Sequence, residues 1–249
     1  MSKELEFDQV ALREPGTGRM LLDGLNLTIP AGQRVAVVGA DEAEKQAFVS
    51  LVLRFLDPSS GEIRIDGKNI RWVTLDSLRN QVALVMQQSL IFNDTVANNI
   101  GCGDPSFSIP QIIEAAKLAH AHNFIQRLPY GYETTIGELG HSLSLGERFR
   151  IALARAILRD PAILIIEEPD GLLDEDNKAM LDDAYERLLP ERTVIFLPHR
   201  LSTIKSCDRV YLIHNGKLEG EGEHRELLQD NELYRHLHYL EYNMFAERV

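Results

Sequence analysis

The sequence is poor in cysteine, in basic charge and in long apolar runs. Cys102 and Cys207 are its two cysteines, far apart and in no motif, which argues against a disulfide framework and suits a reducing compartment. The formal net charge of −12 lacks the basic face that a nucleic-acid surface needs. No apolar run approaches the roughly 20 residues that span a bilayer, and residues 1–10 are mixed and acidic, unlike a signal peptide.

One apolar run ends in two acids. Residues 163–169 read Ile-Leu-Ile-Ile-Glu-Glu-Pro, and a run without alternation predicts a strand buried on both faces of a parallel sheet. Open α/β sheets bind ligands at the carboxyl ends of their strands, where many nucleotide hydrolases hold Mg²⁺ and polarise a water. Glu167 and Glu168 are therefore candidates for those roles, against the alternative that they are solvated acids capping a core strand.

A second pattern places a lysine at the start of a helix. Residues 34–39 form a buried strand that ends in Gly39, and residues 43–55 carry apolar side chains at helical spacing. Lys45 lies at the beginning of that helix. This order of strand, loop and helix is the frame of a P-loop, in which backbone N–H groups and a lysine cradle phosphates at a helix N-terminus.

Strands and helices alternate along the rest of the chain. Further strands are predicted at residues 5–11, 21–29, 61–67, 82–86 and 193–197, with a hairpin at 210–219. Further helices are predicted at residues 74–80, 94–100, 109–127, 148–159, 172–189 and 232–245, with a loop at 141–147. Alternation of this kind predicts an α/β fold with a mostly parallel sheet. The helical stretch of about residues 90–157 interrupts it as an insertion, and residues 1–249 are expected to form a single domain.

Several short motifs follow one another in a fixed order. Gln87 follows the strand at 82–86, residues 143–147 read Leu-Ser-Leu-Gly-Glu, residues 171–174 read Gly-Leu-Leu-Asp, and residues 198–200 read Pro-His-Arg. In this order they resemble the nucleotide-binding domain of ATP-binding cassette (ABC) transporters of the exporter type, over about residues 5–242. The resemblance implies a P-loop NTPase (RecA-like) core, an N-terminal antiparallel β subdomain and a helical insertion subdomain.

The resemblance also implies roles for single residues. It assigns the catalytic positions to Glu168 as general base, His199 as switch histidine and Gln87 as the Q-loop glutamine. It assigns ATP and phosphate binding to Gly39, Lys45, Ser144, Gly146 and Asp174. It assigns Mg²⁺ to Glu167 and Gln87. ATP and Mg²⁺ are the cofactors implied.

Partners follow from the same resemblance. In the family, two nucleotide-binding domains form a head-to-tail dimer, with ATP between the P-loop of one and the signature loop of the other. Hydrolysis drives transmembrane domains from the cytoplasmic face of the membrane. Residues 135–138 look like the exporter loop that touches transmembrane helices. The chain begins almost at the first strand of the domain, so we expect it to be excised from, or partnered with, a transmembrane domain.

The phosphate loop departs from the family pattern G-x-x-G-x-G-K-[ST]-[ST]. Residues 39–47 read Gly-Ala-Asp-Glu-Ala-Glu-Lys-Gln-Ala, so Glu42 and Glu44 replace glycines and Gln46 replaces the hydroxyl that would bind Mg²⁺. Each carboxylate about 5 Å from a phosphate charge costs on the order of 3 kcal/mol at an effective dielectric of about 20. A loss above about 4 kcal/mol is roughly a thousandfold in affinity, and acids that swing outward would lose less.

Other positions depart as well. Glu14 falls where exporters place an aromatic residue on the adenine, and it cannot stack. Glu167 replaces the Walker B aspartate, while Leu145 and Glu147 replace glycine and glutamine of the signature and are expected to crowd and repel the γ-phosphate of the partner. Glu168 at the general-base position is intact.

Three functions remain open from the sequence. The first is an exporter nucleotide-binding domain with a weak or inactive ATP site, and the second is a working ATPase that tolerates an unusual loop. The third is a non-enzymatic pseudo-ATPase module for interaction or regulation, against which residues 135–138 argue. Two structural alternatives also remain open: retention of Glu168 as a helix cap or ion-pair partner, and a salt bridge of Lys45 with Glu42 or Glu44.

Overall fold

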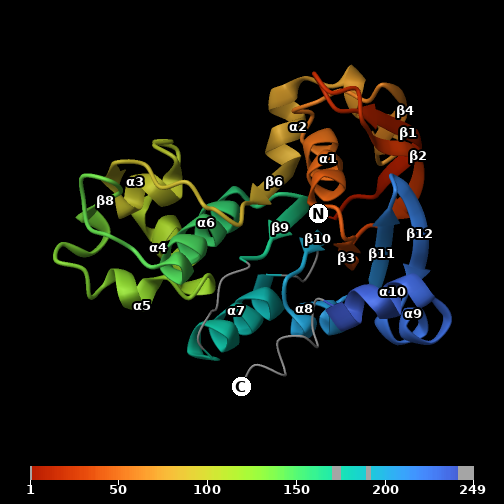
Figure 1. Cartoon of the computed structure of the whole chain (residues 1–249). Helices are drawn as coiled ribbons and strands as arrows, with labels where there is room; N and C mark the ends of the chain where they lie inside the picture. Colours follow the sequence, from red (N-terminus) through yellow and green to blue (C-terminus); the bar gives the residue numbers. More distant parts are fainter. Residues whose placement is uncertain (1, 170–174, 189–191, 241–249) are drawn as a thin grey trace. The chain divides into compact units, whose positions relative to one another are not determined.

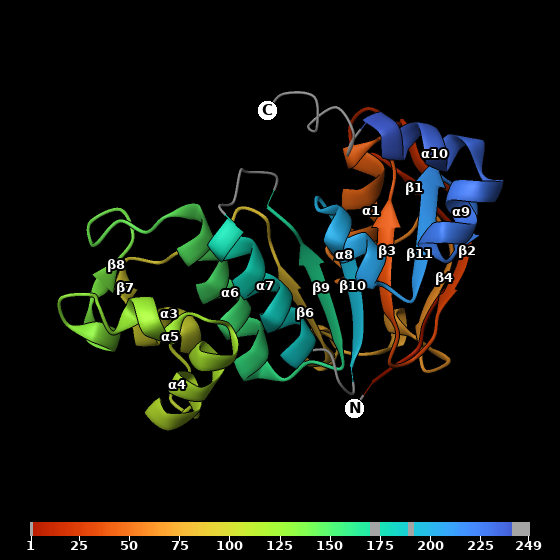
Figure 2. The same cartoon turned by 90° about the horizontal axis from the view of Figure 1, so that it is seen from below.

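The structure is a computed structural model that describes residues 2–169, 175–188 and 192–240 (Figures 1 and 2). It divides into two compact units, which we call unit 1 and unit 2. Unit 1 comprises residues 1–82, 162–165 and 191–249, and unit 2 comprises residues 83–161 and 166–190. No helix within the described ranges is long and apolar enough to cross a membrane.

Unit 1 contains an antiparallel sheet with strand order β2-β1-β4-β5 (Figure 1). Its strands are β1 (Leu5–Arg13), β2 (Met20–Ile29), β4 (Ser60–Ile65) and β5 (Lys68–Asn69). Leu5 pairs with Ile29 on one side and with Ile65 on the other, and all three are buried. The antiparallel N-terminal sheet that the resemblance implied is therefore present.

The larger sheet has the strand order β12-β11-β3-β10-β9-β6. Its strands are β3 (Arg34–Val38), β6 (Val82–Val85), β9 (Ile163–Glu167), β10 (Thr193–Leu197), β11 (Arg209–His214) and β12 (Lys217–Gly222). β3 pairs in parallel with both β10 and β11, whereas β11 and β12 form the predicted antiparallel hairpin. Every residue of β9 is buried, which confirms the prediction from its unbroken apolar run.

Helices cover the sheets of unit 1. They are α1 (Glu42–Val52), η1 (Ile70–Trp72), α2 (Leu75–Gln81), α8 (Leu201–Ser206), α9 (His224–Asp230) and α10 (Glu232–His238). α1 packs on β1, where the rings of Phe48 and Phe7 stack at 4.8 Å. Thr74 caps α2 as predicted, because its hydroxyl accepts from the Ser77 N–H at 3.2 Å.

The predicted C-terminal helix is present in its described part. The helix expected at residues 232–245 contains α10 (Glu232–His238), the backbone of Tyr239 is still helical, and α9 before it was not predicted. Tyr234 and Leu237 are buried in a cluster with Val210 and Leu212, so the prediction of a face that packs on its own domain is confirmed for these two residues. Leu240 is exposed, and residues 241–249 lie outside the described ranges.

Unit 2 is mostly helical, and the predicted insertion at residues 90–157 lies within it. Its further elements are β7 (Asp94–Thr95), α3 (Val96–Gly101), α4 (Ile109–Leu118), α5 (His122–Ile125), η2 (Gly131–Glu133), β8 (Thr135–Ile136), α6 (Leu145–Arg159) and α7 (Glu175–Leu188). α3 and α4 both pack against α6 (Figure 2).

Two predicted boundaries in unit 2 are wrong. The single helix predicted at 109–127 breaks into α4 and α5, because His120 adopts a left-handed conformation with φ of 53° and its ring pairs with Asp183. The loop predicted at 141–147 is too long, since α6 already begins at Leu145 after its cap at Ser144.

Candidate functional site

The loop between β3 and α1 is closely packed at its first residue. A Cβ on Gly39 would lie 2.4 Å from the Ile213 carbonyl oxygen of β11, so this position requires glycine. Asp41 then begins the helix: its carboxylate accepts from the Ala43 N–H at 2.9 Å and pairs with the Arg19 guanidinium. The first acid of the loop is therefore an N-cap, and α1 starts one residue earlier than predicted.

Lys45 contacts a carboxylate of its own helix. Its Nζ lies 2.8 Å from Oε2 of Glu42, one turn earlier, and the lysine is 8% exposed. The amide of Gln46 donates to the other oxygen of Glu42 at 3.4 Å. Of the two partners that the sequence left open for Lys45, the structure therefore selects Glu42.

The Glu42 carboxylate is held in its ionised form. Burial alone would raise its pKa, but the hydrogen bond and charge of Lys45, with contributions from Gln46 and His199, lower the pKa below its usual value of 4.5. His199 follows β10, is exposed, and acts on Glu42 through its charge. At neutral pH the N-terminal turn of α1 thus carries an anion of its own, the Glu42 carboxylate, which we call the internal anion.

Glu44 points elsewhere. Its Oε1 accepts from the N–H of Gly216 at 3.0 Å, in the turn of the β11–β12 hairpin, and the residue is 5% exposed. Its Oε2 is buried and has no hydrogen-bond partner in the described part of the chain. Burial raises the pKa of Glu44, and the charge of Asp41 raises it further. The two glutamates that replace glycines therefore have different surroundings.

The acids at the end of β9 are buried. Glu167 is 8% exposed, and its Oε2 accepts from the backbone N–H of Gln87 at 3.4 Å, while Glu168 is fully buried. The alternative that these residues are solvated acids capping a strand is therefore wrong. Gln87 follows β6, so unit 2 brings the Q-loop position and the Walker B position together.

The N-terminus of α6 forms a capping box. The Glu147 N–H donates to Oγ of Ser144 at 3.3 Å, and Oε2 of Glu147 accepts from the Ser144 N–H at 2.9 Å. Gly146 is buried in the first turn, whereas Leu145 is 43% exposed. The pattern Ser-x-x-Glu before a helix predicts this arrangement, although we had expected a loop over residues 141–147.

The predicted site residues fall into two groups. Unit 1 holds Gly39, Lys45 and His199. Unit 2 holds Gln87, Ser144, Gly146, Glu167 and Glu168. Asp174, with the rest of the motif at residues 171–174, lies outside the described residues.

The described phosphate loop differs from the family pattern at two positions that would contact magnesium phosphate. Gln46 stands where a hydroxyl ligand is expected, and the ammonium of Lys45 contacts Glu42. Across residues 2–169, 175–188 and 192–240, no group of three or more His, Cys, Asp or Glu side chains could hold a metal ion. On the adenine side, Glu14 accepts from the Thr17 hydroxyl at 2.5 Å and offers no aromatic face.

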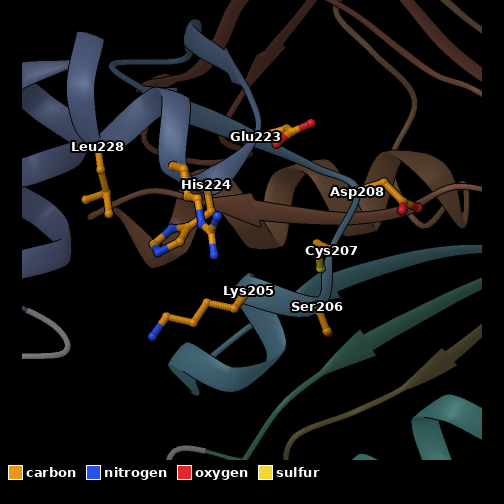
Figure 3. A pocket seen from close by; sticks show the side chains of 8 residues that line it. Lys205, Ser206, Cys207, Asp208, Glu223, His224 and Leu228 are labelled. Carbon is orange, nitrogen blue, oxygen red and sulfur yellow. The ribbon is translucent and has the colours of Figure 1, made fainter.

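A separate cavity of 830 Å³ opens between α8 and α9 in unit 1 (Figure 3). Its lining residues are Lys205, Ser206, Cys207, Asp208, Glu223, His224, Arg225 and Leu228. The ring of His224 forms a hydrogen bond with the Tyr234 hydroxyl at 2.8 Å. Burial lowers the pKa of His224, and the nearby His238, Lys205 and Arg225 lower it further. The lowered pKa favours the uncharged form of His224, and none of the predicted site residues lines this cavity.

Comparison with known proteins finds relatives of this chain among ABC exporters. It is 44% identical over 97% of its length to the "ATP-dependent lipid A-core flippase" of Syntrophus aciditrophicus and 41% identical over 96% to that of Haemophilus influenzae. It superposes on a bacterial Atm1-family ABC exporter solved with ATP bound, with a TM-score of 0.89, 37% identity and 97% of the chain covered.

The length covered in those proteins is smaller. The chain spans 40% and 41% of the two flippases and 42% of the exporter. The family profile described as "ABC transporter" matches residues 22–171. That range is more than half of the chain and includes the loop at Gly39, Lys45, Glu167 and Glu168. The chain belongs to the ABC transporter family, as a nucleotide-binding domain of the exporter type.

Proposed function

We propose that this nucleotide-binding domain serves an ABC exporter in which its own phosphate loop binds Mg-ATP weakly or not at all. One observation carries the proposal: the ammonium of Lys45, which the family uses for phosphate, lies 2.8 Å from the Glu42 carboxylate. Phosphate entering the loop must break this pair and then lie beside Glu42 and Asp41. At about 5 Å and an effective dielectric of about 20, each such repulsion is on the order of 3 kcal/mol.

The domain would couple to a transmembrane partner through unit 2. A cavity of 360 Å³ there is lined by residues 89–91 and by the loop at 137–143, next to β8. Leu90, Phe92 and Leu139 expose 62%, 53% and 89% of their surface in this part of the unit. Large exposed apolar side chains beside a groove mark interaction sites, and we assign this one to the transmembrane domain at the cytoplasmic face of the membrane.

A second nucleotide-binding domain completes the proposed assembly. In a head-to-tail dimer, the Ser144 end of α6 would face the phosphate loop of the partner. A partner domain of different sequence, with a competent phosphate loop, would bind ATP in that loop, opposite the Ser144 end of this chain. The other composite site, which contains the loop at Gly39, would bind ATP weakly or not at all. In a dimer of identical chains, both sites would carry the acidic loop.

Hydrolysis tests the proposal. The intact chain is compared with Glu42→Gly/Glu44→Gly/Gln46→Ser, and with that triple variant carrying Glu168→Gln, for phosphate release from Mg-ATP. We expect background rates from the natural sequence, turnover from the triple variant, and loss of that turnover with Glu168→Gln. Turnover by the natural sequence that depends on Glu168 would contradict the weak site. A triple variant that folds and still lacks turnover would favour the non-enzymatic module.

A further inference from the structure

We propose that Glu42, and not Glu44, is the main residue that excludes phosphate from this site, because its carboxylate occupies Lys45 at the N-terminal turn of α1, and that Glu44 instead links the β11–β12 hairpin to α1. The inference rests on the proposed function and names the residue responsible. It separates two substitutions that look equivalent in the sequence, since each replaces a family glycine by glutamate.

The contacts of Glu42 are those that a bound phosphate would make. Its carboxylate meets the ammonium of Lys45 at 2.8 Å, and the amide of Gln46 donates to its other oxygen. α1 is 11 residues long, and the partial positive charge of its N-terminus favours an anion at this place. The Glu42 side chain is 59% exposed whereas that of Lys45 is 11% exposed, so the carboxylate lies on the solvent side of the lysine.

A second carboxylate of the chain occupies the N-terminus of α1. The carboxylate of Asp41 accepts from the Ala43 N–H and pairs with Arg19. A phosphate would therefore compete with the Glu42 carboxylate for the lysine and with the Asp41 carboxylate for the Ala43 N–H. Glu42 is the decisive competitor because it holds the only lysine in the loop.

Glu44 has no such contact. It accepts from the Gly216 N–H, and the Gly216 carbonyl in turn accepts from the Asp23 N–H of β2 at 2.9 Å. A Cβ on Gly216 would lie 2.9 Å from that same nitrogen, so the turn fits closely between α1 and β2. The carboxylate of Glu44 thus links the helix to the hairpin, and replacing its charge should leave Lys45 as it is.

A matched pair of isosteric variants tests the inference. Mg-ATP and inorganic pyrophosphate are titrated by calorimetry into the intact chain, Glu42→Gln and Glu44→Gln, with thermal unfolding as the check on folding. We expect Glu42→Gln to tighten both ligands at least tenfold and Glu44→Gln to leave both within twofold. Adding Lys45→Met to Glu42→Gln should abolish the gain, because the freed ammonium is what binds phosphate.

Two results would overturn the inference. One is an equal gain from Glu44→Gln. The other is no gain from a folded Glu42→Gln while Glu42→Gly/Glu44→Gly/Gln46→Ser does bind, which would make loop flexibility and the hydroxyl decisive and leave the proposed function standing. Micromolar binding by the natural sequence would instead remove the proposed function itself.

Discussion

The N-termini of α1 and α6 carry the same kind of substitution and use it differently. Each begins with a capping side chain, Asp41 or Ser144, and each has a glutamate within its first turn where the family has another residue. In α6 the glutamate folds back on its own backbone and completes a capping box. In α1 the glutamate reaches Lys45, the side chain that family members offer to phosphate.

The difference lies in what each carboxylate satisfies. Glu147 satisfies a backbone N–H that every helix leaves without an intrahelical partner, so its charge is compatible with an ordinary helix start. Glu42 neutralises a side chain whose charge is the basis of binding. An acidic substitution therefore weakens a phosphate site according to the cation it contacts, and counting acids in the sequence overstates the effect.

Gly39→Ala should have the largest effect on stability, at the base of α1. The added Cβ would lie 2.4 Å from the Ile213 carbonyl oxygen, so β11 or the loop must move. This movement should lower the free energy of unfolding by about 2–3 kcal/mol. The matched control is Gly101→Ala, where the Cβ meets only Ile112 at 3.5 Å, an ordinary contact. Urea unfolding midpoints of the two variants measure the difference, and equal midpoints would contradict the close approach.

The two caps should contribute similar amounts. Asp41→Ala and Ser144→Ala each remove a hydrogen bond to a helix N–H, and each should cost about 1 kcal/mol of unfolding free energy. Asp41→Asn keeps the cap while removing the charge that pairs with Arg19. It should therefore be milder than Asp41→Ala in chemical denaturation. If both cost the same, the ion pair, and not the cap, stabilises the start of α1.

The next smaller effect is a pH dependence at Glu44. Because burial raises its pKa in the folded state, the unfolded chain ionises first as pH rises above 4.5, and the folded state loses stability until its own pKa is passed. Glu44→Gln removes this loss. The free energy of unfolding of Glu44→Gln minus that of the natural chain should therefore be larger at about pH 8 than at about pH 4.

Unfolding free energies measured across that range test the sign for Glu44. A stability difference that does not change with pH would mean that Glu44 ionises equally easily in both states. Asp66 provides a comparison of opposite direction, because its pKa is lowered by its hydrogen bond from Lys3. Asp66→Asn should therefore lose stability relative to the natural chain as pH rises.

Glu147→Gln should have the smallest effect. Glutamine also completes a capping box, so the free energy of unfolding should change by less than about 0.5 kcal/mol. Glu147→Ala removes the bond to the Ser144 N–H and serves as the larger control. Thermal unfolding of both variants gives the comparison. A Glu147→Gln variant as unstable as Glu147→Ala would show that the charge, and not the capping geometry, stabilises α6.

The sequence predicted the sheets better than the site. Unbroken and alternating apolar runs identified β1, β9 and β10, because burial on one or both faces leaves a periodic signal. The break at His120 left no such signal, since it depends on a left-handed residue paired with Asp183.

Side-chain direction limited the prediction of the site. Local spacing was enough to propose that Lys45 pairs with a glutamate of its own helix. It gave no means to tell Glu42 from Glu44, because the partner of Glu44 is Gly216, 172 residues away. The capping box at Ser144 and Glu147 was readable from four residues, whereas the hairpin contact required the fold.

The most direct test is the titration of the Glu42 carboxylate itself. Carbon-detected NMR of the side-chain carboxyl would follow its pKa in the natural chain and in Lys45→Met. We expect a pKa below 4.5 in the natural chain, because Lys45 stabilises the ionised form, and a clear rise in Lys45→Met. A pKa that is at its usual value in the natural chain and does not change in the variant would contradict the internal anion.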